Sequence, residues 1–95
     1  MKINLTHKYL TMLKEMIQDD PHIVVEVERA ILLFNKNVSD SRLDVHPLRG
    51  KLRGKYSFGV TADIRIIFTY IGKNHIRFLA VGPHQVVYPG YSKNK

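Results

Sequence analysis

The sequence contains no cysteine. Disulfide bonds and thiolate metal sites are therefore excluded, and the absence fits a reducing compartment. No stretch approaches the roughly 20 apolar residues that span a bilayer, and residues 1–16 lack the uninterrupted apolar core of a signal peptide. We therefore expect a cytoplasmic protein that has no membrane partner.

The five histidines form no H-x-H or H-E-x-x-H pattern, so we expect neither a metal nor a cofactor. His7, His22 and His75 fall within or at the start of ordinary elements, and we interpret them as structural or surface residues. His46 and His84 stand beside prolines at element boundaries, where functional sites tend to lie. Because histidine is a favoured proton-transfer group near neutral pH, both are candidate catalytic residues, with a structural role as the alternative.

Acidic residues are scarce in the second half of the chain. Residues 1–45 carry six Lys/Arg against seven Asp/Glu, whereas residues 46–95 carry nine Lys/Arg against one Asp/Glu. This concentration of positive charge indicates a surface for phosphates or for an acidic protein, and the alternative is a solvated basic face.

The chain has 95 residues, of which 44% are hydrophobic, which is enough for one domain with a single core. We expect one domain over residues 1–95, with a frayed tail at 90–95. Residues 2–6 alternate polar and apolar side chains and predict a short strand. Residues 7–18 predict a helix that Thr6 caps. Its apolar side chains recur at helical spacing: Leu10, Leu13, Met16 and Ile17.

A second helix is expected after Asp20 and Pro21, with Asp20 as its N-cap and Pro21 as its first residue. Residues 22–34 mix β-branched residues with helix formers, so propensity alone leaves strand and helix open. Their length without Gly or Pro favours a helix. Its apolar face would consist of Ile23, Val27, Ala30, Ile31 and Phe34. The two helices then form an antiparallel hairpin.

The second half is predicted to be a loop followed by strands. The polar segment 35–44 predicts the loop. The expected strands are 55–60, 64–70 and 75–81, the last two joined by a hairpin turn at 71–74, with a short edge strand at 85–88. The fold class is therefore α+β: an N-terminal strand, a helical hairpin, and a twisted, mainly antiparallel sheet of three to four further strands.

The densest basic segment spans residues 46–55 and places a cation at every second position. These cations are Arg49, Lys51, Arg53 and Lys55. In an extended chain all four point to the same side, and such a ladder could follow an RNA phosphate backbone. The alternative is a charged edge strand that resists aggregation.

Asp63 and Arg65 lie two positions apart at the start of a predicted strand and should share a face. Arg65 is a candidate clamp for a phosphate, and a structural Asp63–Arg65 ion pair is the alternative. Tyr88 closes the last predicted strand near His84. Its ring could stack on a nucleobase and its phenol could move a proton, although a packing role is also open.

These residues resemble the RelE/ParE toxin superfamily, and most closely its YafQ-type branch. The resemblance rests on H-P-L-R-G-K-L-R-G at 46–54, D-I-R-I-I-F at 63–68 and L-A-V-G-P-H-Q-V-V-Y at 79–88. It implies a helical hairpin packed against a twisted antiparallel sheet with a basic catalytic face. It also favours a helix over residues 22–34.

The resemblance implies an enzyme that cleaves messenger RNA in the ribosomal A site, without a metal, by attack of a ribose 2′-OH on the adjacent phosphate. Matched by position, His46 or Asp63 would be the general base and His84 the general acid. Arg65 would stabilise the phosphate, and Tyr88 matches a terminal tyrosine of the RelE branch. An antitoxin protein is the implied partner, since a free ribonuclease of this kind would harm its host.

One position departs from the pattern of the family. YafQ-type toxins carry another histidine near position 59 and RelE-type toxins a basic residue, whereas this chain has Gly59. Either Lys55 or Arg53 substitutes for it, or activity is reduced. Two other functions stay open: a ParE-like gyrase inhibitor, and a non-catalytic RNA-binding module.

Overall fold

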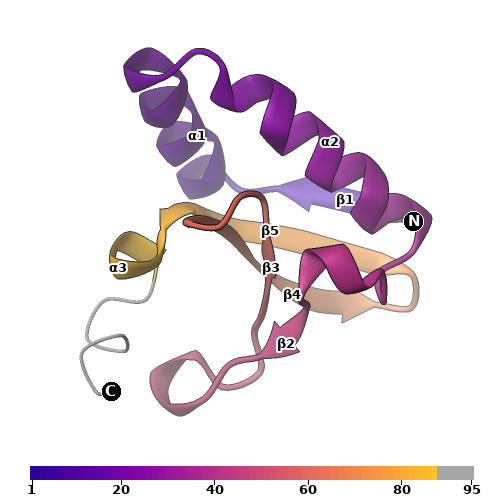
Figure 1. The fold of residues 1–95 in the computed structure, drawn as a ribbon. Helices are drawn as coiled ribbons and strands as arrows, with labels where there is room; N and C mark the ends of the chain where they lie inside the picture. The colour runs from indigo at the N-terminus through magenta and orange to yellow at the C-terminus, as the bar shows by residue number, and fades with distance from the viewer. Residues whose placement is uncertain (88–95) are drawn as a thin grey trace.

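The computed structural model describes residues 1–87 (Figure 1). Its elements follow in the order β1 (Lys2–Leu5), α1 (His7–Asp19), α2 (Ile23–Lys36), the 3₁₀ turn η1 (Ser41–Leu43), β2 (His46–Pro47), the 3₁₀ turn η2 (Gly50–Leu52), β3 (Tyr56–Gly59), β4 (Ile64–Gly72), β5 (His75–Pro83) and α3 (His84–Val87). The expected α+β order is confirmed. Tyr88 and the tail at 90–95 lie outside the described residues.

The strands form one sheet in the order β1-β5-β4-β3-β2. β1 pairs with β5 in parallel, and every other neighbouring pair is antiparallel. The β4–β5 hairpin turns through Asn74, which adopts a φ of 59°, a left-handed conformation that asparagine tolerates better than most residues. Helices α1 and α2 cover one face of the sheet, while α3 and the β2–β3 connection lie on the other side (Figure 1).

The cap of α1 also ties the helix to the sheet. The Thr6 hydroxyl accepts a hydrogen bond from the Tyr9 amide at 3.1 Å, as expected of an N-cap, and donates to the Phe78 carbonyl of β5 at 2.8 Å. The buried face of α1 differs from the expectation, because Leu10 is exposed and Tyr9 is the fully buried side chain. An apolar stripe predicted from spacing alone thus missed the amphipathic tyrosine beside it.

The predicted helix at 22–34 is confirmed as α2, but its start differs by two residues. His22, not Asp20, is the N-cap, and Pro21 precedes the helix. The Asp20 carboxylate instead accepts a hydrogen bond from the His22 amide at 3.2 Å, which closes the turn between α1 and α2. The apolar face of α2 is buried as expected, with Ile31 only partly covered: Ile23, Val27, Ala30 and Phe34.

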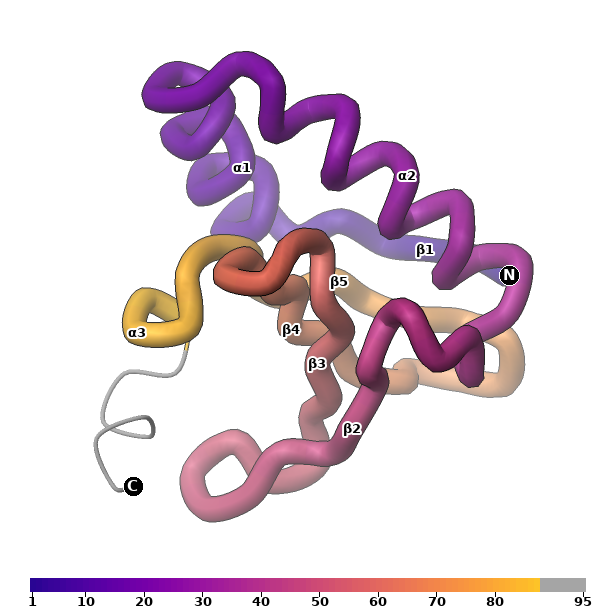
Figure 2. Tube along the Cα trace, viewed as in Figure 1, coloured from indigo at the N-terminus to yellow at the C-terminus, as the bar shows by residue number. Residues whose placement is uncertain are grey.

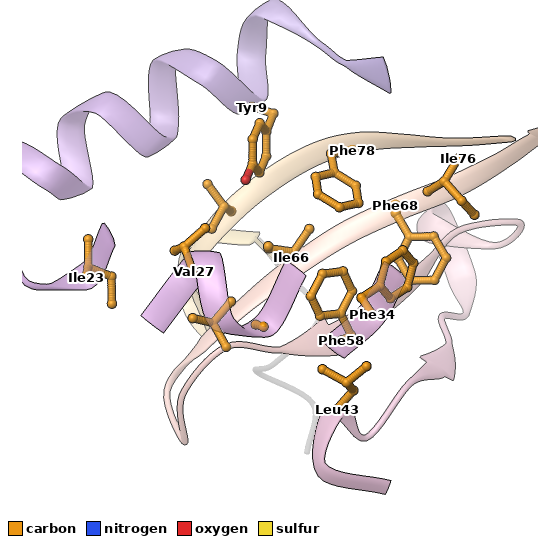
Figure 3. Packing of buried hydrophobic residues seen from close by; sticks show 13 residues of the cluster. Tyr9, Ile23, Val27, Phe34, Leu43, Phe58, Ile66, Phe68, Ile76 and Phe78 are labelled. Carbon is orange, nitrogen blue, oxygen red and sulfur yellow. The ribbon is translucent and has the colours of Figure 1, made fainter. Parts of the chain in front are cut away.

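Phe34 of α2 lies at the centre of the core (Figure 3). Its ring stacks on Phe58 of β3 with centroids 4.4 Å apart, and meets Phe68 of β4 and Phe78 of β5 edge to face at 4.9 and 5.9 Å. Such ring contacts add to the hydrophobic free energy of burying four large side chains. One helical residue therefore contacts the three adjacent strands β3, β4 and β5.

The expected edge strand at 85–88 is wrong, because residues 84–87 form the helical turn α3. Val87 packs with Leu48, Ile67 and Ala80 in a second apolar cluster. Ile67 and Ala80 are cross-strand neighbours, so this cluster covers the sheet face opposite α2. Burying Val87 there favours a turn that folds back over the sheet over one more edge strand.

Candidate active site

Arg65 of β4 is the best-anchored charged side chain on the sheet face opposite α2. Its side chain is only 13% exposed. Nε and Nη2 donate to the Ser57 hydroxyl at 3.2 and 2.8 Å, and Nη2 also donates to the Asp44 carbonyl at 2.8 Å. Nη1 lies 3.5 Å from the Asp44 carboxylate. This set of contacts fixes the plane of the guanidinium.

The alternative of a structural Asp63–Arg65 ion pair is wrong, since Arg65 pairs with Asp44. Asp63 is exposed in the turn between β3 and β4, where its amide donates to the Thr61 hydroxyl at 3.2 Å. Asp63 lies in this turn, and β4 begins only at Ile64. The alternation of side chains along a strand therefore does not apply to Asp63, and the two side chains do not share a face.

Gly59 provides the space that the Arg65 guanidinium occupies. The two residues are direct partners across β3 and β4, and Gly82 of β5 pairs with Arg65 on the other side. A β-carbon at position 59 would lie 3.1 Å from Nη1. The toxin family that the sequence resembles has a larger residue at this position. In this chain the glycine leaves room for the Arg65 side chain.

His46 of β2 meets Arg65 at a shared acceptor. Its Nδ1 lies 3.1 Å from the carbonyl oxygen of Asp44, the same atom that accepts from Arg65 Nη2, and 4.0 Å from the Asp44 carboxylate. Because a carbonyl only accepts, Nδ1 carries the proton in this hydrogen bond, and the neutral ring then keeps a lone pair on Nε2. The His46 side chain is 45% exposed, so the ring is accessible from solvent.

Asp44 holds this arrangement in a left-handed conformation, with φ 49° and ψ 51°. An L residue adopts it rarely, and aspartate does so more readily than most. The turn aims one carbonyl at both His46 and Arg65. Asp44 and Ser57 are not among the site residues expected from the sequence. A small polar residue between the aromatic Tyr56 and Phe58 could have indicated Ser57, whereas no sequence pattern points to the backbone carbonyl of Asp44.

Asp63 and His84 lie at one end of the sheet. Ile64 pairs with Pro83, so Asp63, which directly precedes β4, and His84, which directly follows β5, flank this last pair. The β3–β4 connection accordingly runs beside the start of α3 (Figure 2). His46 is three strands away from β5, or about 14 Å at roughly 4.8 Å per strand. Arg65 of β4 lies between the two groups.

The predicted extended ladder of cations is wrong. The connection between β2 and β3 curls through η2, with left-handed Gly50 (φ 65°) and Gly54 (φ 91°), and the Leu48 amide closes it on the Lys55 carbonyl at 2.9 Å. Arg49, Lys51 and Arg53 are exposed, and Lys55 is half-buried. We call residues 49–55 the basic loop. Its cations surround a turn that starts directly after His46 and Pro47.

Within residues 1–87, no three His, Cys, Asp or Glu side chains gather closely enough to hold a metal ion. In the same part of the chain, no helix is sufficiently long and apolar to cross a membrane. The expected site residue Tyr88 lies beyond the described residues. The arrangement available for chemistry is thus a fixed guanidinium with a histidine beside it, an acid and a second histidine at the sheet end, and a basic loop.

A scan against protein-family models and a search of curated proteins find no match for the sequence. Solved structures do match. YafQ from E. coli strain BL21(DE3) superposes with a TM-score of 0.77 at 18% identity, over 92% of this chain and 97% of that one. The YoeB/ParE toxin from Agrobacterium tumefaciens superposes with a TM-score of 0.74 at 19% identity, over 88% of this chain and 99% of the matched chain.

A third match is the E. coli DinJ-YafQ toxin-antitoxin complex, with a TM-score of 0.74 at 21% identity, over 92% of this chain and 96% of the matched chain. The likeness extends over nearly the whole of each toxin chain. It confirms the fold that the residues at 46–54, 63–68 and 79–88 led us to expect. The chain therefore has the RelE-like fold of the YafQ and YoeB toxins.

Proposed function

We propose that this protein is the toxin of a type II toxin-antitoxin pair and an endoribonuclease that cleaves messenger RNA in the ribosomal A site without a metal. The observation that carries the proposal is the meeting of His46 and Arg65 at the Asp44 carbonyl, on an exposed face beside the basic loop. The fold shared with YafQ and YoeB supports it.

The reaction needs a base, an acid and a group that stabilises charge on the phosphate. A ribose 2′-OH attacks the adjacent phosphorus, the O2′–P bond forms as the P–O5′ bond breaks, and the products are a 2′,3′-cyclic phosphate and a 5′-OH. In the proposed assignment His46 Nε2 takes the proton from the 2′-OH, and His84 protonates the departing 5′-oxygen.

The positions of the two histidines fit this assignment. An in-line displacement places the attacking and departing oxygens on opposite sides of phosphorus. His46 on β2 and His84, which follows β5, lie on opposite sides of the strand that carries Arg65, about 14 Å apart at roughly 4.8 Å per strand. Asp63 precedes β4 at the same end of the sheet as the proposed acid His84, so we assign the base to His46.

Arg65 is positioned to hold the phosphate. Its contact with the Asp44 carboxylate is long, at 3.5 Å, whereas its three contacts to Ser57 and the Asp44 carbonyl are 2.8–3.2 Å. A phosphate oxygen can replace the weak carboxylate contact while the short bonds keep the guanidinium in place. The fixed donors then stabilise the negative charge that develops in the transition state.

The test is incubation of purified protein with ribosomes and message. The wild type should cut the message, and His46→Ala and His84→Ala should lose cleavage while keeping affinity for RNA. His7→Ala, an exposed histidine on α1, is the matched control and should cut normally. Normal cleavage by both site variants would contradict the assignment. Intact message with trapped, cleaved DNA would indicate a gyrase inhibitor, and salt-sensitive binding without a cut would indicate an RNA-binding module.

The proposed antitoxin is an acidic peptide that covers the basic face. One of the matched structures is a complex of this type, the E. coli DinJ-YafQ toxin-antitoxin complex. If a short acidic protein is encoded just upstream, its co-expression should abolish cleavage. Normal cleavage in its presence would refute that partner.

A further inference from the structure

A hollow of about 510 Å³ lies next to His46, between the segment 38–47 and two aromatic rings, the half-buried Tyr56 of β3 and the exposed Tyr70 of β4. Its walls include Ser39, Ser41, Asp44, His46, Tyr56 and Tyr70. We propose that this hollow binds one nucleobase of the RNA, on the nucleotide next to the cut phosphate, with Tyr70 as its stacking surface. The inference rests on the proposed function and adds a base-binding subsite to it.

The Tyr70 ring is both exposed and held in place. The residue is 48% exposed. Its ring stands at 82° to Tyr56 with centroids 5.1 Å apart, and at 77° to the fully buried Phe68 with centroids 5.6 Å apart. These edge-to-face contacts keep the ring in one orientation. A base that stacks on it therefore binds without the entropy loss of ordering a mobile side chain.

The opposite wall suits a base edge better than a phosphate. Ser39 and Ser41 contribute hydroxyl groups that can donate or accept hydrogen bonds. Asp40 also lines the hollow, and its carboxylate is paired with Arg42, whose Nε and Nη2 donate to it at 3.0 and 2.8 Å. The side-chain hydrogen bond from Arg42 lowers the pKa of Asp40 to about 2, so the carboxyl is ionised at neutral pH and its charge is balanced by Arg42. The wall lacks the cation surplus of the basic loop.

Two residues connect the hollow to the proposed chemistry. His46 and Asp44 line it, and the same two residues contact each other and, through Asp44, Arg65. His46 is the point at which a base in the hollow and a phosphate on Arg65 can belong to one nucleotide, because it lines the hollow and shares the Asp44 carbonyl with Arg65. Holding that base fixes the 2′-OH relative to Nε2 of His46, which is the positioning that a 2′-OH attack needs.

The test measures the affinity of short single-stranded RNA oligonucleotides, intact or with one base removed at each position in turn. All proteins carry His84→Ala, so that the RNA is not cut. Removing the base that enters the hollow should weaken binding to the parent about ten-fold. Tyr70→Ala should weaken binding of the intact RNA by a similar factor and be insensitive to removal of that base. Tyr70→Phe should bind like the parent.

Two further variants complete the design. Ser39→Trp fills the hollow from the opposite wall without touching the ring contacts, and should reproduce the loss seen with Tyr70→Ala. Leu32→Ala removes an exposed apolar side chain from the outer side of α2 and should change nothing. If removal of each base weakened Tyr70→Ala and its parent equally, the subsite would be refuted. If base-dependent binding is found but the wild type cuts no message on ribosomes, the subsite stands and the proposed function fails.

Discussion

Gly59 and Arg65 face each other across β3 and β4, and the guanidinium Nη1 lies 3.1 Å from where a β-carbon at position 59 would stand. This contact is tighter than ordinary packing, so a side chain at position 59 would require the Arg65 guanidinium to move by a few tenths of an ångström. The carbonyl oxygen of Leu43, at 3.5 Å from the same point, closes the other side. The space at position 59 and the orientation of Arg65 are therefore one structural feature.

We expect Gly59→Ala to lower the rate of message cleavage by roughly ten- to hundred-fold, because a methyl group displaces the guanidinium from the position in which we propose that it holds the phosphate. Gly72→Ala is the matched control, since a β-carbon there meets only the His75 β-carbon at an ordinary 3.7 Å. Cleavage rates on ribosomes measure the effect. A Gly59→Ala protein that cuts as fast as Gly72→Ala would show that Arg65 tolerates the displacement.

Ser57→Ala should lower the free energy of unfolding by about 1–3 kcal/mol, because it leaves two donors of the largely buried Arg65 without their acceptor. Urea unfolding of four proteins measures it: wild type, Ser57→Ala, Arg65→Met and the double variant. In the Arg65→Met background the serine change should cost little, since the donors are gone. Equal costs in both backgrounds would mean that Ser57 stabilises the sheet by packing alone.

The basic loop should contribute to RNA affinity through phosphate contacts. Changing Arg49, Lys51 and Arg53 together to Gln should weaken binding of single-stranded RNA and flatten the slope of log K against log salt by up to about 2, at about 0.7 per contact. Binding titrations at several salt concentrations measure the slope. The control changes the exposed Lys2, Lys8 and Lys14 to Gln and removes the same charge from the first half of the chain. Equal slopes for both triple variants would argue against a localised RNA surface.

Tyr9→Phe should leave the protein as stable or more stable, because the Tyr9 hydroxyl is buried and has no hydrogen-bond partner among residues 1–87. Burial raises the pKa of Tyr9 from 10.0 to about 12. The folded state thus favours the neutral phenol. Its contribution to the free energy of unfolding is complete below pH 10 and is lost as the pH rises toward 12. Urea unfolding between pH 9 and about 12 should show the wild type weakening more than Tyr9→Phe. Parallel curves would place the hydroxyl in contact with solvent.

The helices and long strands were predictable because they depend on local patterns. For residues 22–34, the length of the segment without Gly or Pro correctly favoured a helix over a strand. The buried face of α2 is the one expected from the spacing of its apolar residues. Errors arose where tertiary packing decides. Tyr9 rather than Leu10 is buried because the orientation of α1 places the Tyr9 ring against Phe78, with ring centroids 5.3 Å apart. Residues 84–87 turn into α3 because Val87 has an apolar cluster to join.

The candidate site was predictable only in part, for the same reason. His46 and Arg65 were selected from the sequence, and the structure places them around one acceptor. Asp44, which provides that acceptor, lies 21 residues before Arg65 and acts through a backbone carbonyl in a left-handed turn. Periodicity reports which side chains share a face and says nothing about such an atom. The basic loop was misread because Gly50 and Gly54 curl a segment whose alternation suggested a strand.

The parallel pairing of β1 with β5 has a consequence for synthesis of the protein. Lys2 is the register partner of His75, and the Thr6 hydroxyl bonds to a carbonyl 72 positions later. Neither contact can form until β5 has been translated, and long-range pairing of this kind is slow. The nascent chain therefore cannot complete its sheet before β5 has been translated, which delays the appearance of the folded domain.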